Sequence, residues 1–415
     1  MLDIQKIREN KAEIEKALKK RVPEINLDEI LELDKQRRDL IAKLDNLKAE
    51  KNKHSKTKPS LEIIEEMKKI GVEIKILEEK FNDLDKKFKE ELSSLPNIPA
   101  ADVLAGGKEN NEVISTYGKK PQFSFKIKDH MELAQSLNLI DYQRATKMSG
   151  AGFWAYVGQG AELEWALWNY FKDFHQKNGY KFLLLPYLLN QESAYASGHL
   201  PKFKEDLFWT NNEQLCLNAT SEMMLLNYHR DEILKQDLPL KYYAFSPCFR
   251  KEAGAYRTKE RGIMRGHQFN KIEMFHFAEP VKSEESFNEL LKNAEKLVQG
   301  LGLHFQTSKL AAQDTSATMA KTIDLEVYFP SIDIYKEVSS VSNALDYQAR
   351  RANIKYQDEQ GNKKFVHTLN ASGLATSRIL PAILEQNQQA DGSVKIPKVL
   401  RKYLNFKILK SRIEK

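Results

Sequence analysis

The sequence predicts an α+β fold in two parts: an N-terminal antiparallel two-helix coiled-coil arm, then a domain built on a mainly antiparallel β-sheet flanked by helices. Residues 28–95 carry apolar side chains at alternating steps of three and four, the period of a coiled coil. From Asp129 onward, short segments alternate apolar and polar side chains, as half-buried strands do. Strands that follow one another along the chain favour antiparallel pairing. We therefore expect an arm domain of residues 1–110 and a second domain of residues 111–415.

The predicted arm rests on two matching apolar stripes. The stripe of the second helix is unbroken and consists of Ile63, Met67, Ile70, Ile74, Leu77, Phe81, Leu84 and Phe88. The first helix repeats the spacing with one polar position, in the series Leu33, Arg37, Leu40, Leu44 and Leu47. The residues Lys58-Pro59-Ser60 would connect the two helices, and Pro96 and Pro99 would end the second one. Several lysines lie on the first helix close to this connection. They could bind a nucleic-acid backbone, or they could form an ordinary solvated face.

Residues 100–125 are polar, contain Gly106-Gly107, and read as a linker between the two parts. Beyond the linker, Glu162–His175 has the pattern of a helix. The expected strands are Phe182–Leu185, Lys241–Phe249, Asn270–Phe277 and Asp324–Phe329.

Two of these strands, Lys241–Phe249 and Asn270–Phe277, would form a hairpin with a long loop. Charged and aromatic side chains gather at its open end: Arg250, Lys251, Glu252, Arg265, His267, Phe269 and Glu273. The arginine fork can donate two parallel hydrogen bonds to phosphate or carboxylate oxygens. The hairpin can therefore hold a polyanion beside an aromatic ring, although a solvated surface hairpin explains the same charges.

A second group of small and polar residues lies near the C-terminus. The segment from Leu369 to Arg378 reads as a strand, a turn of small residues, and a helix that carries an arginine in its first turn. Small residues let a ligand approach the backbone, and a helix start favours anions. The run Glu337-Val338-Ser339-Ser340 lies between the two groups in the chain.

Composition excludes several classes of protein. The 415 residues contain 65 Lys and Arg against 58 Asp and Glu, a net charge of +7 that suits a polyanionic partner if it is clustered. The two cysteines, Cys216 and Cys248, form no Cys-x-x-Cys pair, so we expect no zinc site and a reducing compartment. No apolar run suits a signal peptide or a membrane span. Glycine-rich Rossmann and P-loop motifs are absent from the sequence as well.

The motifs resemble those of class II aminoacyl-tRNA synthetases. The Arg-x-Glu hairpin with its Arg-x-His-Gln-Phe return resembles motif 2 of that class, the turn before Arg378 resembles motif 3, and Gly179-Tyr180 with Leu183–Pro186 resembles motif 1. Further segments are similar to the seryl-tRNA synthetase family in chain order: Leu200–Phe203, Asn218–Glu222, Glu337–Ser340 and Asp346–Arg351. The resemblance covers essentially the whole chain, and that family carries an N-terminal helical arm.

The resemblance implies an ATP site with Arg250, Glu337 and Arg378 as catalytic residues. Arg250 would hold the α-phosphate together with the substrate carboxylate, Phe269 would stack on adenine, and Arg378 would cover its other face or reach the γ-phosphate. Glu337 and Ser340 would bind Mg²⁺, which prefers hard oxygen ligands. The other expected ATP contacts are Lys251, Glu252, Arg265, His267, Val338 and Ser339.

The resemblance also implies serine as the substrate. Glu273 and Ser372 would face the serine hydroxyl, Thr220, Ser221 and Glu222 would hold its ammonium group, and Arg250 its carboxylate. For Thr220-Ser221-Glu222, a helix N-cap explains the local sequence equally well. Lys48, Lys51 and Lys53 would contact tRNA. We expect a cytoplasmic homodimer. It would form seryl-adenylate from L-serine and ATP and transfer the seryl group to tRNA(Ser). Whether tRNA(Sec) is a second substrate is not decided by the sequence.

Four positions depart from the family pattern: Gln313, Ala344, Ala371 and Ser377. They leave open a specialised or weakly active paralogue, such as an inhibitor-tolerant form or a serine ligase that feeds a carrier protein. A non-catalytic RNA-binding protein with the same fold is a further alternative, because a fold does not fix a function.

Overall fold

The computed structural model describes residues 1–54, 61–252 and 262–411. The chain divides into two compact units, Met1–Ile98 and Pro99–Lys415. The expected connection Lys58-Pro59-Ser60 lies outside the described residues.

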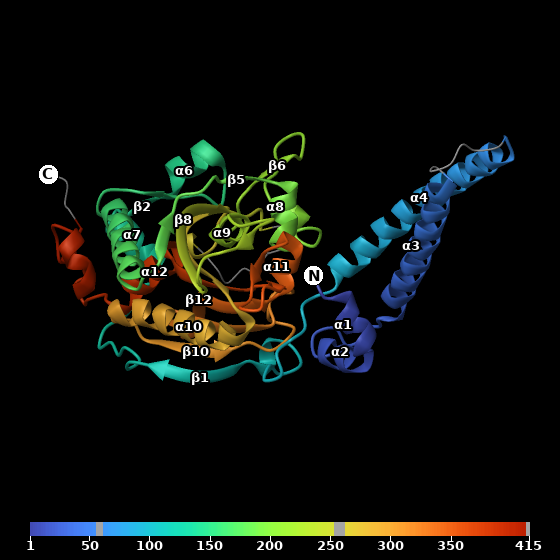
Figure 1. The fold of residues 1–415 in the computed structure, drawn as a ribbon. Helices are drawn as coiled ribbons and strands as arrows, with labels where there is room; N and C mark the ends of the chain where they lie inside the picture. The colour runs from blue at the N-terminus through green and yellow to red at the C-terminus, as the bar shows by residue number, and fades with distance from the viewer. Residues whose placement is uncertain (55–60, 253–261, 412–415) are drawn as a thin grey trace. The chain divides into compact units, whose positions relative to one another are not determined.

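The first unit is helical. It contains α1 (Ile4–Glu9), α2 (Lys11–Leu18), α3 (Asp28–His54) and α4 (Leu61–Ser94). Helices α3 and α4 lie side by side in opposite directions, which confirms the predicted coiled-coil hairpin (Figure 1). Leu44, Ile70 and Ile74 form its buried core. Leu47, Leu77 and Phe81 pack against this core, so the predicted stripes are the packed faces.

The polar stripe position, Arg37, is accommodated by partners on the facing helix. Its Nε lies 2.5 Å from Oδ1 of Asp85. Its guanidinium carbon lies 5.6 Å and 5.3 Å from the ring centroids of Phe81 and Phe88. An arginine can fill a seam position in this way because its apolar stem packs while its planar head pairs with a carboxylate and stacks on rings.

The second unit is built on a sheet in which eight of the described strands pair. Its order is β1-β10-β11-β12-β15-β9-β8-β4. All neighbours are antiparallel except β4 and β8, which are parallel. The strands are β1 (Glu112–Tyr117), β4 (Lys181–Leu183), β8 (Leu240–Phe249), β9 (Gln268–Ala278), β10 (Phe305–Lys309), β11 (Lys321–Phe329), β12 (Ile334–Leu345) and β15 (His367–Ala375). The predicted α+β class with a mainly antiparallel sheet is confirmed.

One expectation was wrong. Residues 112–117, placed in the linker by the sequence, form β1 at the edge of the main sheet and pair with β10. The hydroxyls of Ser115 and Thr307 join the two strands at 2.6 Å. All six residues of β1 are exposed, and their order, Glu-Val-Ile-Ser-Thr-Tyr, places the two aliphatic residues next to each other instead of alternating them with polar ones.

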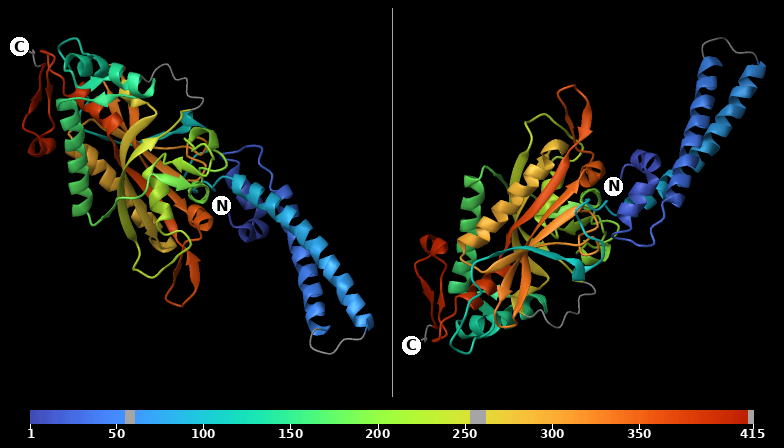
Figure 2. Two further views of the ribbon diagram at one scale, coloured as in Figure 1. Left: turned by 90° about the horizontal axis from the view of Figure 1, so that it is seen from above. Right: turned by 90° about the horizontal axis from the view of Figure 1, so that it is seen from below.

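Side chains alternate between the two faces of the sheet. Ile272, Met274, Ile323, Leu325 and Leu369 point into the main core. That core also takes apolar side chains from α7 (Gln159–Lys177), α10 (Ser283–Gly300) and α12 (Thr376–Gln386). Figure 2 shows the long helices packed along the twisted sheet. The residues between the core positions face the opposite side, which leaves a polar row on that face.

Shorter elements frame this polar face and the ends of the sheet. The helices are α5 (His130–Ser136), α6 (Tyr142–Ser149), α8 (Gln191–Ala196), α9 (Ser221–Asn227) and α11 (Tyr347–Ala352). The short strands are β2 (Ile140–Asp141), β3 (Ala155–Tyr156), β5 (Leu188–Asn190), β6 (Leu215–Leu217), β7 (Ile233–Leu234), β13 (Lys355–Gln357), β14 (Lys363–Phe365), β16 (Val394–Lys395) and β17 (Ile408–Leu409). In the described ranges, no helix combines the length and apolar character needed to span a membrane.

Candidate functional site

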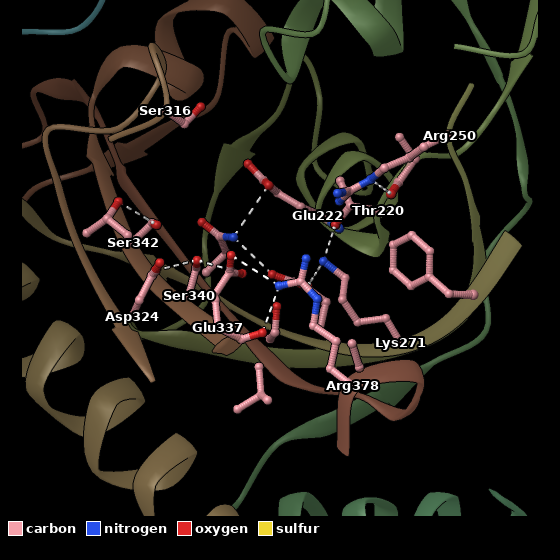
Figure 3. Close-up of a pocket in the computed structure, with 18 of the residues that line it drawn as sticks. Thr220, Glu222, Arg250, Lys271, Ser316, Asp324, Glu337, Ser340, Ser342 and Arg378 are labelled. Carbon is pink, nitrogen blue, oxygen red and sulfur yellow. Dashed lines mark hydrogen bonds and ion pairs between the residues drawn. The ribbon is translucent and has the colours of Figure 1, made fainter. Parts of the chain in front are cut away.

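A cavity of about 920 Å³ lies over the polar face of the sheet. Its wall comes from β9, β11, β12 and β15, with contributions from α9 and the start of α12. Figure 3 shows the side chains of these elements converging on one space. The predicted site residues on the wall are Thr220, Glu222, Arg250, Glu252, Arg265, Phe269, Glu273, Glu337, Val338, Ser340, Ser372 and Arg378.

Arg250 follows the end of β8, and neighbours hold its side chain in place. Its guanidinium carbon lies 5.1 Å from the centroid of the Phe269 ring, on the paired strand β9. Its Nε donates to the backbone oxygen of Ala219 at 3.3 Å. The end of the hairpin therefore holds a guanidinium beside an aromatic ring, and the hydrogen bond to Ala219 uses one of the five N–H donors of the arginine.

Glu252 and Arg265 bind each other across the open end of the hairpin. Arg265 donates from Nε to Oε2 of Glu252 at 2.7 Å. Glu252 has a positive φ of 53°. A non-glycine residue rarely adopts this conformation, and such strain often marks functional positions. The family resemblance implies that Glu252 accepts a hydrogen bond from the adenine amino group, and this contact would share the carboxylate with Arg265.

A row of oxygen ligands lies along β11 and β12. The Ser340 hydroxyl lies 2.6 Å from Oδ1 of Asp324 and 3.3 Å from Oε1 of Glu337. Arg378 donates from Nη1 to the backbone oxygen of Glu337 at 2.7 Å, and the same nitrogen lies 3.2 Å from the Glu337 carboxylate.

The two carboxylates of this row have opposite pKa shifts. Burial raises the pKa of Asp324 well above its usual value, and the nearby charge of Glu337 raises it further. Burial also acts to raise the pKa of Glu337, but the cations of Arg378 and Arg250 lower it overall. One carboxylate is therefore held ionised beside arginines, while its neighbour has no ion pair with a cation in the described part of the chain.

Lys271 and Glu273 form a buried pair on β9. Nζ of Lys271 lies 2.5 Å from Oε2 of Glu273, and the two side chains are 8% and 1% exposed. The same Nζ donates to Oγ1 of Thr220 at 2.8 Å. Thr220 is also the N-cap of α9, so the helix-cap interpretation of this segment is correct at the same time as its side chain lines the cavity.

Glu222 and Glu273 approach each other through one amide. Asn370 donates from Nδ2 to Oε1 of Glu273 at 2.9 Å and lies 3.4 Å from Oε2 of Glu222. Gln348 donates to Glu222 at 2.6 Å. Burial raises the pKa of Glu222 to about 7, with a further contribution from the charge of Glu273. Glu222 is thus a carboxylate that a bound cation would stabilise in its ionised form.

Four predicted site residues lie off the cavity wall. The hydroxyl of Ser221 bonds to that of Ser246 at 2.7 Å, and Ser339 donates to the backbone oxygen of Ser372 at 2.7 Å. The Nδ1 atom of His267 lies 3.1 Å from the backbone oxygen of Arg250. The remaining residue, Lys251, has an exposed side chain.

Three of the four departures from the family pattern do not line the cavity. Ser377 alone among the four lines it, next to Arg378. Ala371 and Ala344 are fully buried positions in strands, off the wall. Gln313 donates its backbone N–H to Gly106 at 2.9 Å.

Several wall residues were missed in the sequence: His199, Lys271, Asp324 and Asn370. Lys271 and Asn370 occupy alternate positions with Glu273 and Ser372, so strand periodicity could have identified them. His199 could not be found in this way. Its Nδ1 lies 2.9 Å from the Ser197 hydroxyl, and burial, helped by Arg250 and Lys271, lowers its pKa to about 3.

The predicted tRNA-binding lysines lie on α3. Nζ of Lys48 lies 2.8 Å from a carboxylate oxygen of Glu78 on α4. Lys51 and Lys53 have exposed side chains. In the described parts of the chain, no group of three or more His, Cys, Asp or Glu side chains could hold a metal ion.

Both parts of the chain match known families. Residues 1–99 match the seryl-tRNA synthetase N-terminal domain. Residues 203–387 match the tRNA synthetase class II core domain (G, H, P, S and T). A protein of Clostridium acetobutylicum named serine–tRNA ligase 2 is 52% identical over 421 residues, covering 97% of this chain and 99% of that protein. A serine–tRNA ligase of Geobacter sulfurreducens is 43% identical over 415 residues, covering 97% and 98%.

Solved structures agree with these relatives. The seryl-tRNA synthetase of Pyrococcus horikoshii complexed with ATP superposes with a TM-score of 0.92 at 34% identity, covering 99% of this chain and 100% of that one. The cytoplasmic serine–tRNA ligase of Naegleria fowleri in complex with AMP gives 0.88 at 32% identity, covering 99% of each. These matches span arm and catalytic core together and favour the ligase prediction over its alternatives. The chain therefore belongs to the seryl-tRNA synthetase family of class II aminoacyl-tRNA synthetases.

Proposed function

We propose that this chain is a serine–tRNA ligase, which activates L-serine with ATP and transfers the seryl group to tRNA(Ser). The observation that carries the proposal is the group formed by Glu222, Asn370 and Glu273 beside Arg250, at the floor of the cavity. It provides carboxylates for an ammonium group and a hydroxyl, and a guanidinium for a carboxylate, within the space of a small amino acid.

The charges of this group suit a zwitterion. Lys271 neutralises Glu273, whereas Glu222 forms no ion pair with a cation among the described residues and feels the charges of Lys271 and Arg250 only weakly. A serine ammonium would supply that cation, and Arg250 would take the serine carboxylate. The side chains of Glu273 and Ser372 would then face the hydroxyl of the serine substrate. A site that hydrogen-bonds this hydroxyl rejects alanine, because alanine leaves its buried polar groups unpaired.

Activation requires the serine carboxylate to attack the α-phosphorus while pyrophosphate leaves. No protein nucleophile is needed, so the chain contributes positioning and charge neutralisation. Arg250 would hold both reacting groups and Phe269 would stack on the adenine, which is supported by the contact of these two side chains at 5.1 Å. Arg378, anchored on Glu337, would cover the other face of the adenine or reach the γ-phosphate. Arg265 and His267 would bind the β- and γ-phosphates. Lys251, Val338 and Ser339 remain expected neighbours of the nucleotide.

The family implies Mg²⁺ with ATP, and the residues fit such an ion. Glu337 and Ser340 offer hard oxygen donors, and the raised pKa of neighbouring Asp324 marks a place where a cation would relieve carboxylate repulsion. Two carboxylates and a hydroxyl suffice for Mg²⁺, which completes its shell with phosphate oxygens and water. When bound, the ion would neutralise phosphate charge and fix the bend of the triphosphate.

We further propose that the protein works as a homodimer in the cytoplasm. Trp165 on α7 and Leu184 after β4 are 68% and 69% exposed, and Leu184 belongs to the segment that resembles motif 1. Large exposed apolar side chains of this kind mark interaction surfaces. Cys216 and Cys248 are free thiols, which agrees with a reducing compartment. The arm domain, predicted as residues 1–110, would bind tRNA through lysines that include Lys48, Lys51 and Lys53.

Amino-acid-dependent ATP–pyrophosphate exchange tests the proposal directly. Serine should support exchange at least about a hundredfold better than alanine, because alanine leaves the polar groups that pair with the hydroxyl unsatisfied. Threonine, which adds a methyl group, and cysteine, which replaces the hydroxyl by a thiol, should also support less exchange than serine. Charging of tRNA(Ser) should follow with the same protein. Exchange that is equal for all four amino acids, or absent, would refute the assignment.

A further inference from the structure

A single buried carboxylate connects the two segments that carry Phe269 and Arg378, the side chains proposed to contact the adenine. Glu164 lies on α7 and is 5% exposed. Its Oε1 accepts a hydrogen bond from Nδ2 of Asn270 at 3.0 Å and from Oγ1 of Thr376 at 2.6 Å. Asn270 belongs to β9, and Thr376 begins α12, so one oxygen atom links three elements.

These contacts are adjacent to residues of the ATP site. Asn270 directly follows Phe269 in the chain, and Thr376 lies two positions before Arg378. The backbone pairing of β15 with β9 is irregular between Ser372 and Ala375. Sheet hydrogen bonds alone therefore do not fix the distance between the Phe269 strand and the Arg378 helix at this point.

The chemistry of the contact is unusual for a purely structural link. Both donors to Oε1 of Glu164 are neutral, and so is the nearby Trp168 side chain, which together with them acts to lower the pKa of the carboxyl. Among the described residues no hydrogen-bond partner meets the geometry for the second oxygen, Oε2. Burying a carboxylate without a cation is costly, and burial here raises the pKa of Glu164 to about 7. A neutral glutamine amide could fill the same space at a lower free-energy cost of burial. We therefore infer that the stronger hydrogen-bond acceptance of the carboxylate matters at this position.

We propose that Glu164 is a positioning residue for the nucleotide: its carboxylate sets the separation of Phe269 and Arg378, and so determines ATP affinity without touching ATP. The proposal rests on the proposed ATP site. Serine contacts lie farther along β9 and β15, at Glu273 and Asn370, where the two strands pair regularly. Loss of the link should therefore affect ATP and leave serine recognition intact.

The test compares Glu164→Ala and Glu164→Gln with the unaltered protein. Glu164→Ala should raise both KM for ATP in serine-dependent exchange and Kd for ATP from calorimetry by about tenfold, the effect of losing one or two hydrogen bonds. KM for serine should stay within about twofold. Glu164→Gln keeps an acceptor oxygen of similar shape, so it should restore part of the ATP affinity.

Glu385→Gln is the matched control. Glu385 is a fully buried glutamate on α12 that accepts from His130 and Ser331, away from the nucleotide residues. The Glu385→Gln variant should lower thermal stability, but it should not raise KM for ATP relative to KM for serine. Thr376→Val should reproduce the ATP defect, and its effect should not add to that of Glu164→Ala, because both remove the same link.

Two results would overturn the proposal. One is an unchanged Kd for ATP in Glu164→Ala; the other is a parallel rise of both KM values that Glu385→Gln reproduces. Failure of the proposed function would look different, because the unaltered protein would then show no serine-dependent exchange. The calorimetric Kd for ATP still tests the role of Glu164 in that case.

Discussion

The ammonium of Lys271 lies 2.5 Å from the carboxylate of Glu273, and less than a tenth of either side chain is exposed. The pair lies on one strand, with both residues on the cavity face. It supplies the charge balance that the proposed serine site needs, and removal of either partner would leave an uncompensated buried charge.

Lys271→Met should therefore destabilise the second unit by about 3–5 kcal/mol, measured as the free energy of unfolding in urea. Lys241→Met is the matched control, since Lys241 pairs with Glu289 at 2.7 Å but both side chains are 26–33% exposed. That partly exposed pair remains in contact with water and should contribute no more than about 1 kcal/mol. Equal losses in the two variants would contradict the inferred role of burial.

Arg250→Ala should lower serine-dependent exchange by at least about a hundredfold, because a positioned cation at developing charge contributes on that scale. Arg250→Lys should recover little, since an ammonium cannot reproduce the arginine fork. Unchanged circular dichroism would show that the fold persists. Arg144→Ala, at a side chain 85% exposed, provides the control and should leave exchange unchanged. Near-normal exchange in Arg250→Ala would exclude the assignment.

Serine binding should weaken in acid. Burial and then Glu273 raise the pKa of Glu222 to about 7, so below that pH its carboxyl is protonated and cannot pair with an ammonium. KM for serine should rise as pH falls from 8 to 6, approaching about tenfold per pH unit. Glu222→Gln should flatten this profile while raising KM overall. A serine KM that is constant over this range would show that Glu222 does not contact the ammonium.

Glu273→Ala should reduce the preference for serine over alanine by about tenfold to a hundredfold, the effect of removing a buried hydrogen-bond partner. The ratio of kcat/KM for the two amino acids in exchange measures it. Ser372→Ala should lower the same ratio to a smaller extent. If both variants keep the original ratio, the hydroxyl is recognised elsewhere in the cavity.

Replacement of residues 28–95 by a short linker should leave exchange nearly intact and reduce tRNA charging by orders of magnitude. The seam of the hairpin is made within the first unit, so its removal does not open the core of the second. A truncated protein that charges tRNA normally would show that the arm does not bind RNA.

The arm lysines allow a finer test. Neutralising Lys48, Lys51 and Lys53 together should flatten the salt dependence of tRNA binding, by about 0.7–0.9 in slope for each phosphate that a lysine no longer neutralises. Lys80, Lys86 and Lys87, exposed on α4, give a control triple with the same change of charge. Equal slopes for the two triples would show that Lys48, Lys51 and Lys53 do not bind phosphate in preference to other arm lysines.

The sequence by itself determined the elements with strong local patterns. Unbroken apolar stripes predicted the arm helices, because a coiled coil is built from neighbours three and four residues apart. Alternation predicted the hairpin of β8 and β9, and therefore the positions of Arg250, Phe269 and Glu273. The exposed edge strand β1 has no such pattern, since its pairing with β10 depends on the backbone.

Only the tertiary structure decided which side chains share the cavity. Asp324 reaches the site because β11, β12 and β15 are neighbours in the sheet. Glu164 lies about a hundred residues before Asn270 in the chain, yet one of its oxygens binds both Asn270 and Thr376. Periodicity predicts only how a residue is arranged relative to its near neighbours in the chain. The burial and the charges that shift the pKa of Glu222 come from segments that are far apart in the sequence.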